Sequence, residues 1–146
     1  MIKLREQIQP GPLPAHLHAW LLELVRAVNA FIEGGVFADV TQTQEHWSGL
    51  ITTPSDKSYT LVLKCPHAGT ITEATTKSAS GTCTATFKVN TTALGGTANS
   101  VSSAEQSQAH SSTNTFAAGD DIVVTVSSNS SCADMAFTLK YARELE

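Results

Sequence analysis

The sequence predicts a mainly β protein of the α+β class, in which an N-terminal extended arm and a single amphipathic helix precede an antiparallel β-sandwich. Apolar residues recur at helical spacing between residues 15 and 33, and from residue 58 onward they alternate with polar residues. The first pattern predicts a helix and the second predicts half-buried strands. The predicted divisions are therefore an arm at 1–14, a helix at 15–33, a connector at 34–57 and a β-sandwich at 58–146.

The predicted arm ends in the run Gln-Pro-Gly-Pro-Leu-Pro. Pro10, Pro12 and Pro14 fix their own φ angles, lack a backbone donor and favour extended geometry in the residues before them. The arm can therefore be neither a helix nor a central strand. We expect it to be loose or to lie along another surface.

Residues 15–33 are predicted to form a helix, with Pro14 at its start and Gly34-Gly35 after its end. Apolar residues recur there at alternating spacings of four and three, which is the a/d pattern of a coiled coil or bundle. Trp20, Val25 and Ile32 widen this apolar stripe. The predicted oligomer interface consists of Leu17, Trp20, Leu21, Leu24, Val28 and Phe31.

An isolated helix of this length is marginal in water, so its apolar stripe must pack on something. Two surfaces could bury this stripe: the β-domain of the same chain, or the same helix in other copies. The Gly34-Gly35 break and the polar connector favour other copies. The width of the stripe suits more than two helices, so a homotrimer is the preferred assembly.

Residues 34–57 show no clear period and are predicted to be a connector that packs in part. The run Asp39–Gln44 could form a short strand, and Phe37 and Trp47 are the expected anchors.

The β-region contains four strong alternating sets and three weaker strands. Short alternating strands between Gly, Asn and Ser turns indicate an antiparallel sandwich, here predicted as jelly-roll-like. The weaker strands are expected at 69–76, 98–104 and 109–114. The strong inward-facing sets are Tyr59, Leu61, Leu63 and Cys65; Cys83, Ala85, Phe87 and Val89; Ile122, Val124 and Val126; and Met135, Phe137, Leu139 and Tyr141.

Composition disfavours several classes of function. A net charge of −4 and few basic residues argue against nucleic-acid binding. The most apolar segment is short and contains Glu23 and Arg26, so no membrane span is predicted. The N-terminus lacks the apolar region of a signal peptide, which favours synthesis in a cytoplasm. Cys65 and Cys83 fall in alternating runs and are expected to be buried, whereas Cys132 is expected to be the accessible cysteine.

No catalytic, cofactor or metal site is predicted. Gly119-Asp120-Asp121 lies directly before a strand, where Gly and Asp are ordinary turn residues. His16 and His18 are two apart and diverge on a helix. The sequence has no CxxC pair, phosphate loop or dinucleotide fingerprint.

Three passages carry a resemblance to a known group of proteins. These are IQPGPLPAHLHAWLLELVRAVNA at 8–30, GTITEATTK with GTCTATFKVN at 69–77 and 81–90, and NTFAAGDDIVVTV at 114–126. Together they cover most of the chain. In the order of its parts, the sequence resembles small structural proteins of tailed-bacteriophage virions.

The resemblance implies a non-enzymatic, homotrimeric fibre, spike or head-decoration protein, made in the host cytoplasm and located in the virion. It implies capsid, collar or tail proteins as partners, with the arm and helix attached to the virion. Attachment is therefore expected at Pro10, Pro12, Leu13 and Pro14.

Two other functions stay open. A carbohydrate-binding module for host-surface adhesion would use the hydroxyl-rich loops 100–115 and 127–131 to bind a glycan. Trp47, Phe116 and Tyr141 are its candidate sugar-stacking residues, although each is expected in the core. A small hydrolase is suggested only by the abundance of Ser, Asp and His.

Overall fold

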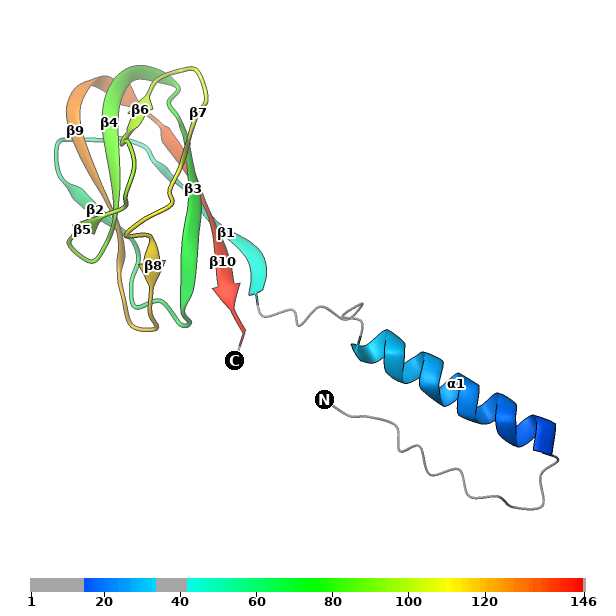
Figure 1. The fold of residues 1–146 in the computed structure, drawn as a ribbon. Helices are drawn as coiled ribbons and strands as arrows, with labels where there is room; N and C mark the ends of the chain where they lie inside the picture. The colour runs from blue at the N-terminus through cyan, green and yellow to red at the C-terminus, as the bar shows by residue number, and fades with distance from the viewer. Residues whose placement is uncertain (1–14, 34–41, 146) are drawn as a thin grey trace. The chain divides into compact units, whose positions relative to one another are not determined.

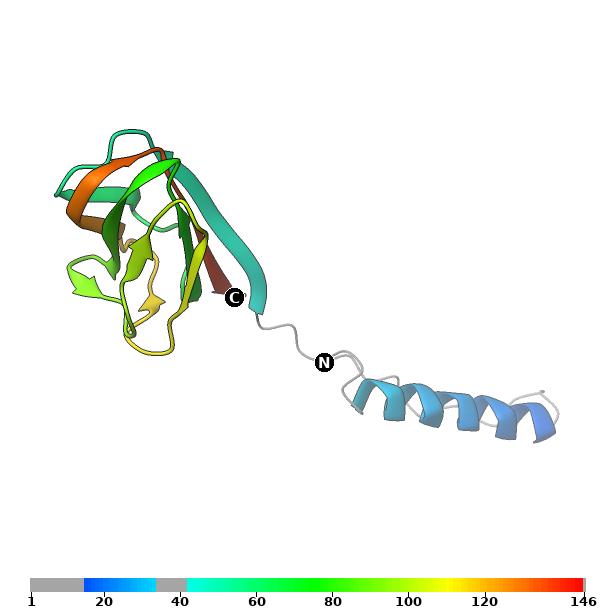
Figure 2. The ribbon, with the colours of Figure 1, turned by 90° about the horizontal axis from the view of Figure 1, so that it is seen from above.

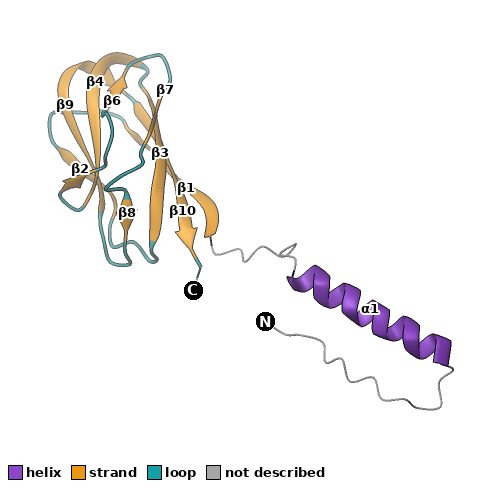
Figure 3. Cartoon of the chain, in the orientation of Figure 1, coloured by secondary structure: helices purple, strands orange, loops and turns teal. Residues whose placement is uncertain are grey.

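The computed structural model describes residues 15–33 and 42–145, which fall into two units, one within residues 1–40 and one within 41–146. The first unit contains helix α1 (Ala15–Glu33), and the second contains ten described strands in two antiparallel sheets (Figures 1 and 3). The predicted class, one helix followed by a mainly antiparallel β-sandwich, is confirmed. The arm at 1–14 lies outside the described residues, as do residues 34–41 of the predicted connector.

Sheet A has the strand order β1-β10-β3-β7, and β8 also pairs with β3. The bounds are β1 (Gln42–Ile51), β10 (Met135–Glu144), β3 (Gly69–Lys77), β7 (Gln106–Ala109) and β8 (Thr115–Phe116). Strands β1 and β10 pair along their whole length, from Gln42 opposite Glu144 to Ile51 opposite Met135.

Sheet B has the strand order β2-β9-β4-β5, and β6 also pairs with β4. The bounds are β2 (Ser58–Val62), β9 (Ile122–Ala133), β4 (Ser80–Val89), β5 (Thr92–Ala93) and β6 (Asn99–Val101). Figure 2, seen from above, shows the two sheets as facing layers.

The connections between the sheets define the topology. If β5 and β6 share one strand position and β7 and β8 share another, the sheets contain eight positions in the orders 1-8-3-6 and 2-7-4-5. Chain neighbours then lie in opposite sheets except at one step. This is the strand order of a jelly roll, as predicted.

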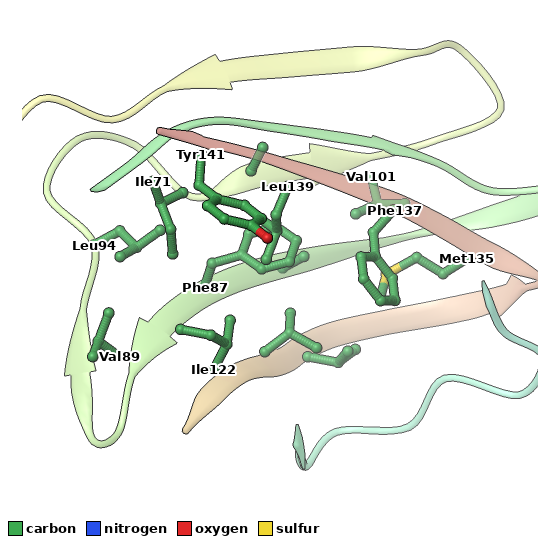
Figure 4. Close-up of a cluster of buried hydrophobic side chains, with 14 of the residues drawn as sticks. Ile71, Phe87, Val89, Leu94, Val101, Ile122, Met135, Phe137, Leu139 and Tyr141 are labelled. Carbon is green, nitrogen blue, oxygen red and sulfur yellow. The ribbon is translucent and has the colours of Figure 1, made fainter. Parts of the chain in front are cut away.

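The core lies between the two sheets (Figure 4). Each of the last three predicted inward sets is buried, with exposed fractions of 9 % or less. Tyr59 and Leu61 are partly buried and pack against the same core. Fully burying one large apolar side chain contributes about 1.5–3 kcal/mol, so these alternating sets account for much of the stability of the sandwich.

The predicted connector extends too far. Residues 42–57 belong to the second unit, and β1 forms the edge of sheet A that includes the predicted anchor Trp47. The inward positions of β1 are Thr43, Glu45, Trp47, Gly49 and Ile51. Polar and glycine residues occupy three of them, so the period of two is hidden in the sequence.

The inward position predicted for Leu63 is wrong, because Leu63 is 71 % exposed. The pairing of β2 with β9 shifts register between Thr60 and Val62, and β2 ends at Val62. Lys64 then takes a φ of 53° and donates its backbone N–H to Oδ1 of Asp121. The turn reverses the alternation before Cys65 returns to the core.

Two more predictions need correction. Residues 110–114 form no strand, since β7 ends at Ala109 and β8 begins at Thr115. Two backbone bonds still link this segment to β3, from the Ile71 N–H to the Asn114 carbonyl oxygen and from the His110 N–H to that of Thr72. The buried side chain of Asn114 also donates to the carbonyl oxygens of Ile71 and His110. Cys132 is not accessible: it lies in β9 and is 5 % exposed. The other weak strands, at 69–76 and 98–104, correspond to β3 and β6, the latter in part.

Candidate assembly and binding surfaces

The apolar stripe of helix α1 is the candidate assembly surface. Leu17, Trp20 and Leu24 are 37 %, 58 % and 46 % exposed, and Leu21 and Val28 are half-buried. At about 100° per residue, these five side chains fall on a band roughly 100° wide. The apolar face of the described helix is therefore partly exposed to solvent.

The opposite face of α1 carries the charged residues Glu23 and Arg26, both exposed. Within the described residues, no helix combines the length and apolar character that a bilayer span requires. The side chain of Phe31 lies outside the described residues. So do the predicted attachment residues Pro10, Pro12, Leu13 and Pro14, and their roles stay predictions.

The carboxylate of Asp120 holds the turn at Gly119–Asp121. Gly119 has a φ of 92°, in the left-handed region that favours glycine. Oδ2 of Asp120 accepts the backbone N–H of Ala117 at 2.8 Å, and its Oδ1 accepts Nδ2 of Asn90 at 2.9 Å. Asp121 donates its backbone N–H to Oδ1 of Asn90. The interpretation of this segment as a turn is confirmed.

The electrostatics of Asp120 agree with this role. The hydrogen bond from the Ala117 backbone, and then that from Asn90, lower the pKa of the Asp120 carboxyl. In the described part of the chain, no three His, Cys, Asp or Glu side chains come close enough to hold a metal ion.

An aromatic cluster fills the sandwich beside strands β1 and β10. The rings of Trp47 and Tyr141 stack with centroids 4.0 Å apart, and Phe116 and His67 pack against both. Phe116 and Tyr141 are 3 % and 2 % exposed. Phe116 and Tyr141 are core residues, as expected, and neither offers an open ring face for a sugar. Trp47 is partly buried and packs against the same core.

Glu45 of β1 binds Tyr141 of this cluster and Arg143 of β10. The Tyr141 hydroxyl donates to Oε2 of Glu45 at 2.7 Å, and the Arg143 guanidinium lies 3.4 Å from Oε1. The Tyr141 hydrogen bond lowers the pKa of Glu45, with a further contribution from Arg143. Burial, and then the bond to Glu45, raise the pKa of Tyr141. This polar group lets Glu45 occupy an inward position of β1.

The outer face of sheet A has two shallow hollows, of about 320 and 180 Å³, which share Thr138. The larger is lined by Gln44, Glu45, His46, Ser48, Thr138 and Lys140. Amide, hydroxyl and charged groups therefore gather on one face, and sequence reasoning missed them because it placed Gln44, Glu45, His46 and Ser48 in the connector. The predicted glycan loops differ: His110 and Asn114 of loop 100–115 are buried.

Comparison with known proteins adds no relative. No protein-family model matches the sequence, and no curated protein matches it.

Proposed function

We propose that the protein is a non-enzymatic structural component of a tailed-phage virion, of the fibre, spike or head-decoration type. In this proposal the helix assembles copies of the chain, the Pro-rich arm binds another virion protein, and the jelly roll is displayed. The observation that carries the proposal is the exposed apolar stripe of α1.

The stripe favours a second copy of the same helix as its cover. Leu17, Leu21, Leu24 and Val28 follow the alternating four-and-three spacing, which lets equivalent helices interlock side by side. Trp20 adds width to the stripe, and a wide stripe suits three helices better than two.

The jelly roll agrees with this proposal as a fold-level analogy. Viral capsid proteins and lectins are among the proteins that use this architecture. Because one fold serves many functions, the analogy supports the proposal without carrying it.

The direct test is whether the protein is a constituent of assembled particles. We expect the genes beside its own to encode capsid or tail proteins. We also expect antibodies raised against the β-unit to label one fixed place on purified virions in electron micrographs. Particles that contain no copy of the protein, from a host that makes it, would contradict the proposal.

A second candidate is a carbohydrate-binding module, favoured by the hollows on the outer face of sheet A. Gln44, His46 and Lys140 line the larger hollow with the donor and acceptor groups that sugar hydroxyls need. Binding on a glycan array that is lost in Gln44→Ala or His46→Ala would support it. Thr86→Ala, on the outer face of sheet B, is the matched control and should leave binding unchanged.

A further inference from the structure

Three sulfur atoms meet in the core at the pairing of β4 with β9. Sγ of Cys83 lies 3.5 Å from Sγ of Cys132 and 3.8 Å from Sδ of Met135. Cys83 and Cys132 are 4 % and 5 % exposed, and both are free thiols. Cys65 is also buried and free, and it lies outside this group of three sulfur atoms.

A bulge in β9 brings the two thiols together. Thr84 pairs with Ser127, whereas Thr82 pairs with both Ser130 and Ser131, so β9 contains extra residues at this point. Ser128 and Ser131 take φ angles of 52° and 53° to accommodate them. In the register that pairs Thr84 with Ser127, Cys132 would lie opposite Ala79, two residues further from Cys83.

Gly81 allows β9 to approach β4 closely at Cys132, because glycine has no Cβ atom. Since Ser80 pairs with Ala133 and Thr82 with Ser131, Gly81 lies opposite Cys132. A Cβ atom on Gly81 would come within 2.1 Å of the Ser131 carbonyl oxygen and 2.5 Å of the Cys132 nitrogen. Cys83 is then the diagonal neighbour of Cys132, and the two sulfur atoms lie 3.5 Å apart.

We propose that Cys83 and Cys132 are an oxidation site that closes to a disulfide within one chain when the protein meets a peroxide. The two S–H bonds and the O–O bond of hydrogen peroxide break, one S–S bond forms, and two water molecules leave. The two sulfur atoms lose the two electrons that the peroxide gains. The inference is independent of the proposed function.

Burial of the two thiols and the redox state of the solvent determine when the disulfide forms. Burial raises the pKa of the Cys83 thiol, so little of its reactive thiolate is present at neutral pH. A reducing cytoplasm keeps such thiols reduced, whereas an oxidising environment outside a cell favours the disulfide. The cross-link would join strands of the same sheet whose cysteines are 49 residues apart in the chain. Closing such a loop restricts the unfolded chain and so stabilises the folded one.

Tryptic mapping of the full chain tests the proposal without any substitution. Cleavage after Lys64, Lys77, Lys88 and Lys140 places the three cysteines on separate peptides, at 65–77, 78–88 and 89–140. After treatment with hydrogen peroxide, we expect 78–88 joined to 89–140 and a free thiol on 65–77. A cross-link through 65–77, or oxygen added to Cys83 or Cys132 without a cross-link, would overturn the proposal.

Thermal unfolding provides the second readout, with Cys65→Ser as the matched control. Peroxide should raise the midpoint by on the order of 10 °C in the native chain and in Cys65→Ser. Cys83→Ala and Cys132→Ala should show no increase. Should these variants fail to fold, the peptide map of the native chain still decides the outcome. An equal increase in all four proteins would contradict the proposal.

Discussion

Phe87 in strand β4 and Trp20 in helix α1 are both large aromatic residues on a regular apolar face, yet Phe87 is 2 % exposed and Trp20 is 58 % exposed. In the β-unit, the buried apolar side chains of both sheets pack together in one core. The described helix has one apolar stripe, and Leu17, Trp20 and Leu24 on it are exposed. The comparison teaches that regular apolar spacing predicts which face of an element should be buried. It does not predict whether the same unit or another copy of the chain buries that face.

The largest expected effect is the loss of stability when a core side chain of the β-unit is truncated. Phe87→Ala should lower the free energy of unfolding by about 3–5 kcal/mol, because it removes a buried ring and leaves a cavity. Urea unfolding followed by circular dichroism measures this loss. Thr86→Ala, its neighbour on the outer face of sheet B, should change stability by less than about 1 kcal/mol. Equal losses in the two variants would contradict the assigned core.

A buried polar contact should produce the next largest effect. Asn99 is fully buried, and its Nδ2 donates to the Ala74 carbonyl oxygen at 2.9 Å and to Oγ1 of Thr76 at 3.2 Å. Asn99→Ala leaves these groups with one donor fewer and should cost about 1–3 kcal/mol in urea unfolding. The adjacent exposed residue gives the control, Ser100→Ala, which should unfold like the native chain. A neutral Asn99→Ala would show that this contact does not stabilise the sandwich.

The smallest effect concerns the turn at Gly119–Asp121. Hydrogen bonds lower the pKa of Asp120 below its ordinary value of 3.8. A carboxyl whose pKa is lower in the folded state stabilises it above the unfolded-state value and loses that contribution as pH falls through the folded-state value. Asp120→Asn should therefore be less stable than the native chain near neutral pH, with the difference shrinking in acid. A difference that grows in acid would contradict this assignment.

Sequence reasoning predicted the parts of the fold where alternation is unbroken. The inward sets that contain Phe87, Val124 and Leu139 are buried as expected, because β4 pairs with β9 in constant register from Thr84 to Val89, and β10 pairs with β1 in constant register along its whole length. The helix bounds at residues 15 and 33 are also confirmed. Capping and periodicity are local properties, which a sequence displays directly.

The errors arose where pairing overrides the local pattern. Most of β1 was not predicted because Thr43, Glu45 and Gly49 occupy inward positions. At one of them, the Glu45 carboxylate is bound by Tyr141 and Arg143. Cys132 was misplaced because extra residues in β9 return it to the core. A bulge and a cross-strand hydrogen bond depend on residues far away in the chain, so a single sequence does not reveal them.

Light scattering of the full chain tests the central claim, that the stripe on α1 recruits other copies, most directly. We expect the native chain to be an oligomer and Leu24→Asp to have the mass of a single chain, because a carboxylate cannot be buried in an apolar seam. Ala19→Asp, on the opposite face of the helix, should keep the native mass, and all three proteins should share the thermal midpoint of the β-unit. A native chain that is already a single copy, or a Leu24→Asp variant of unchanged mass, would contradict the claim.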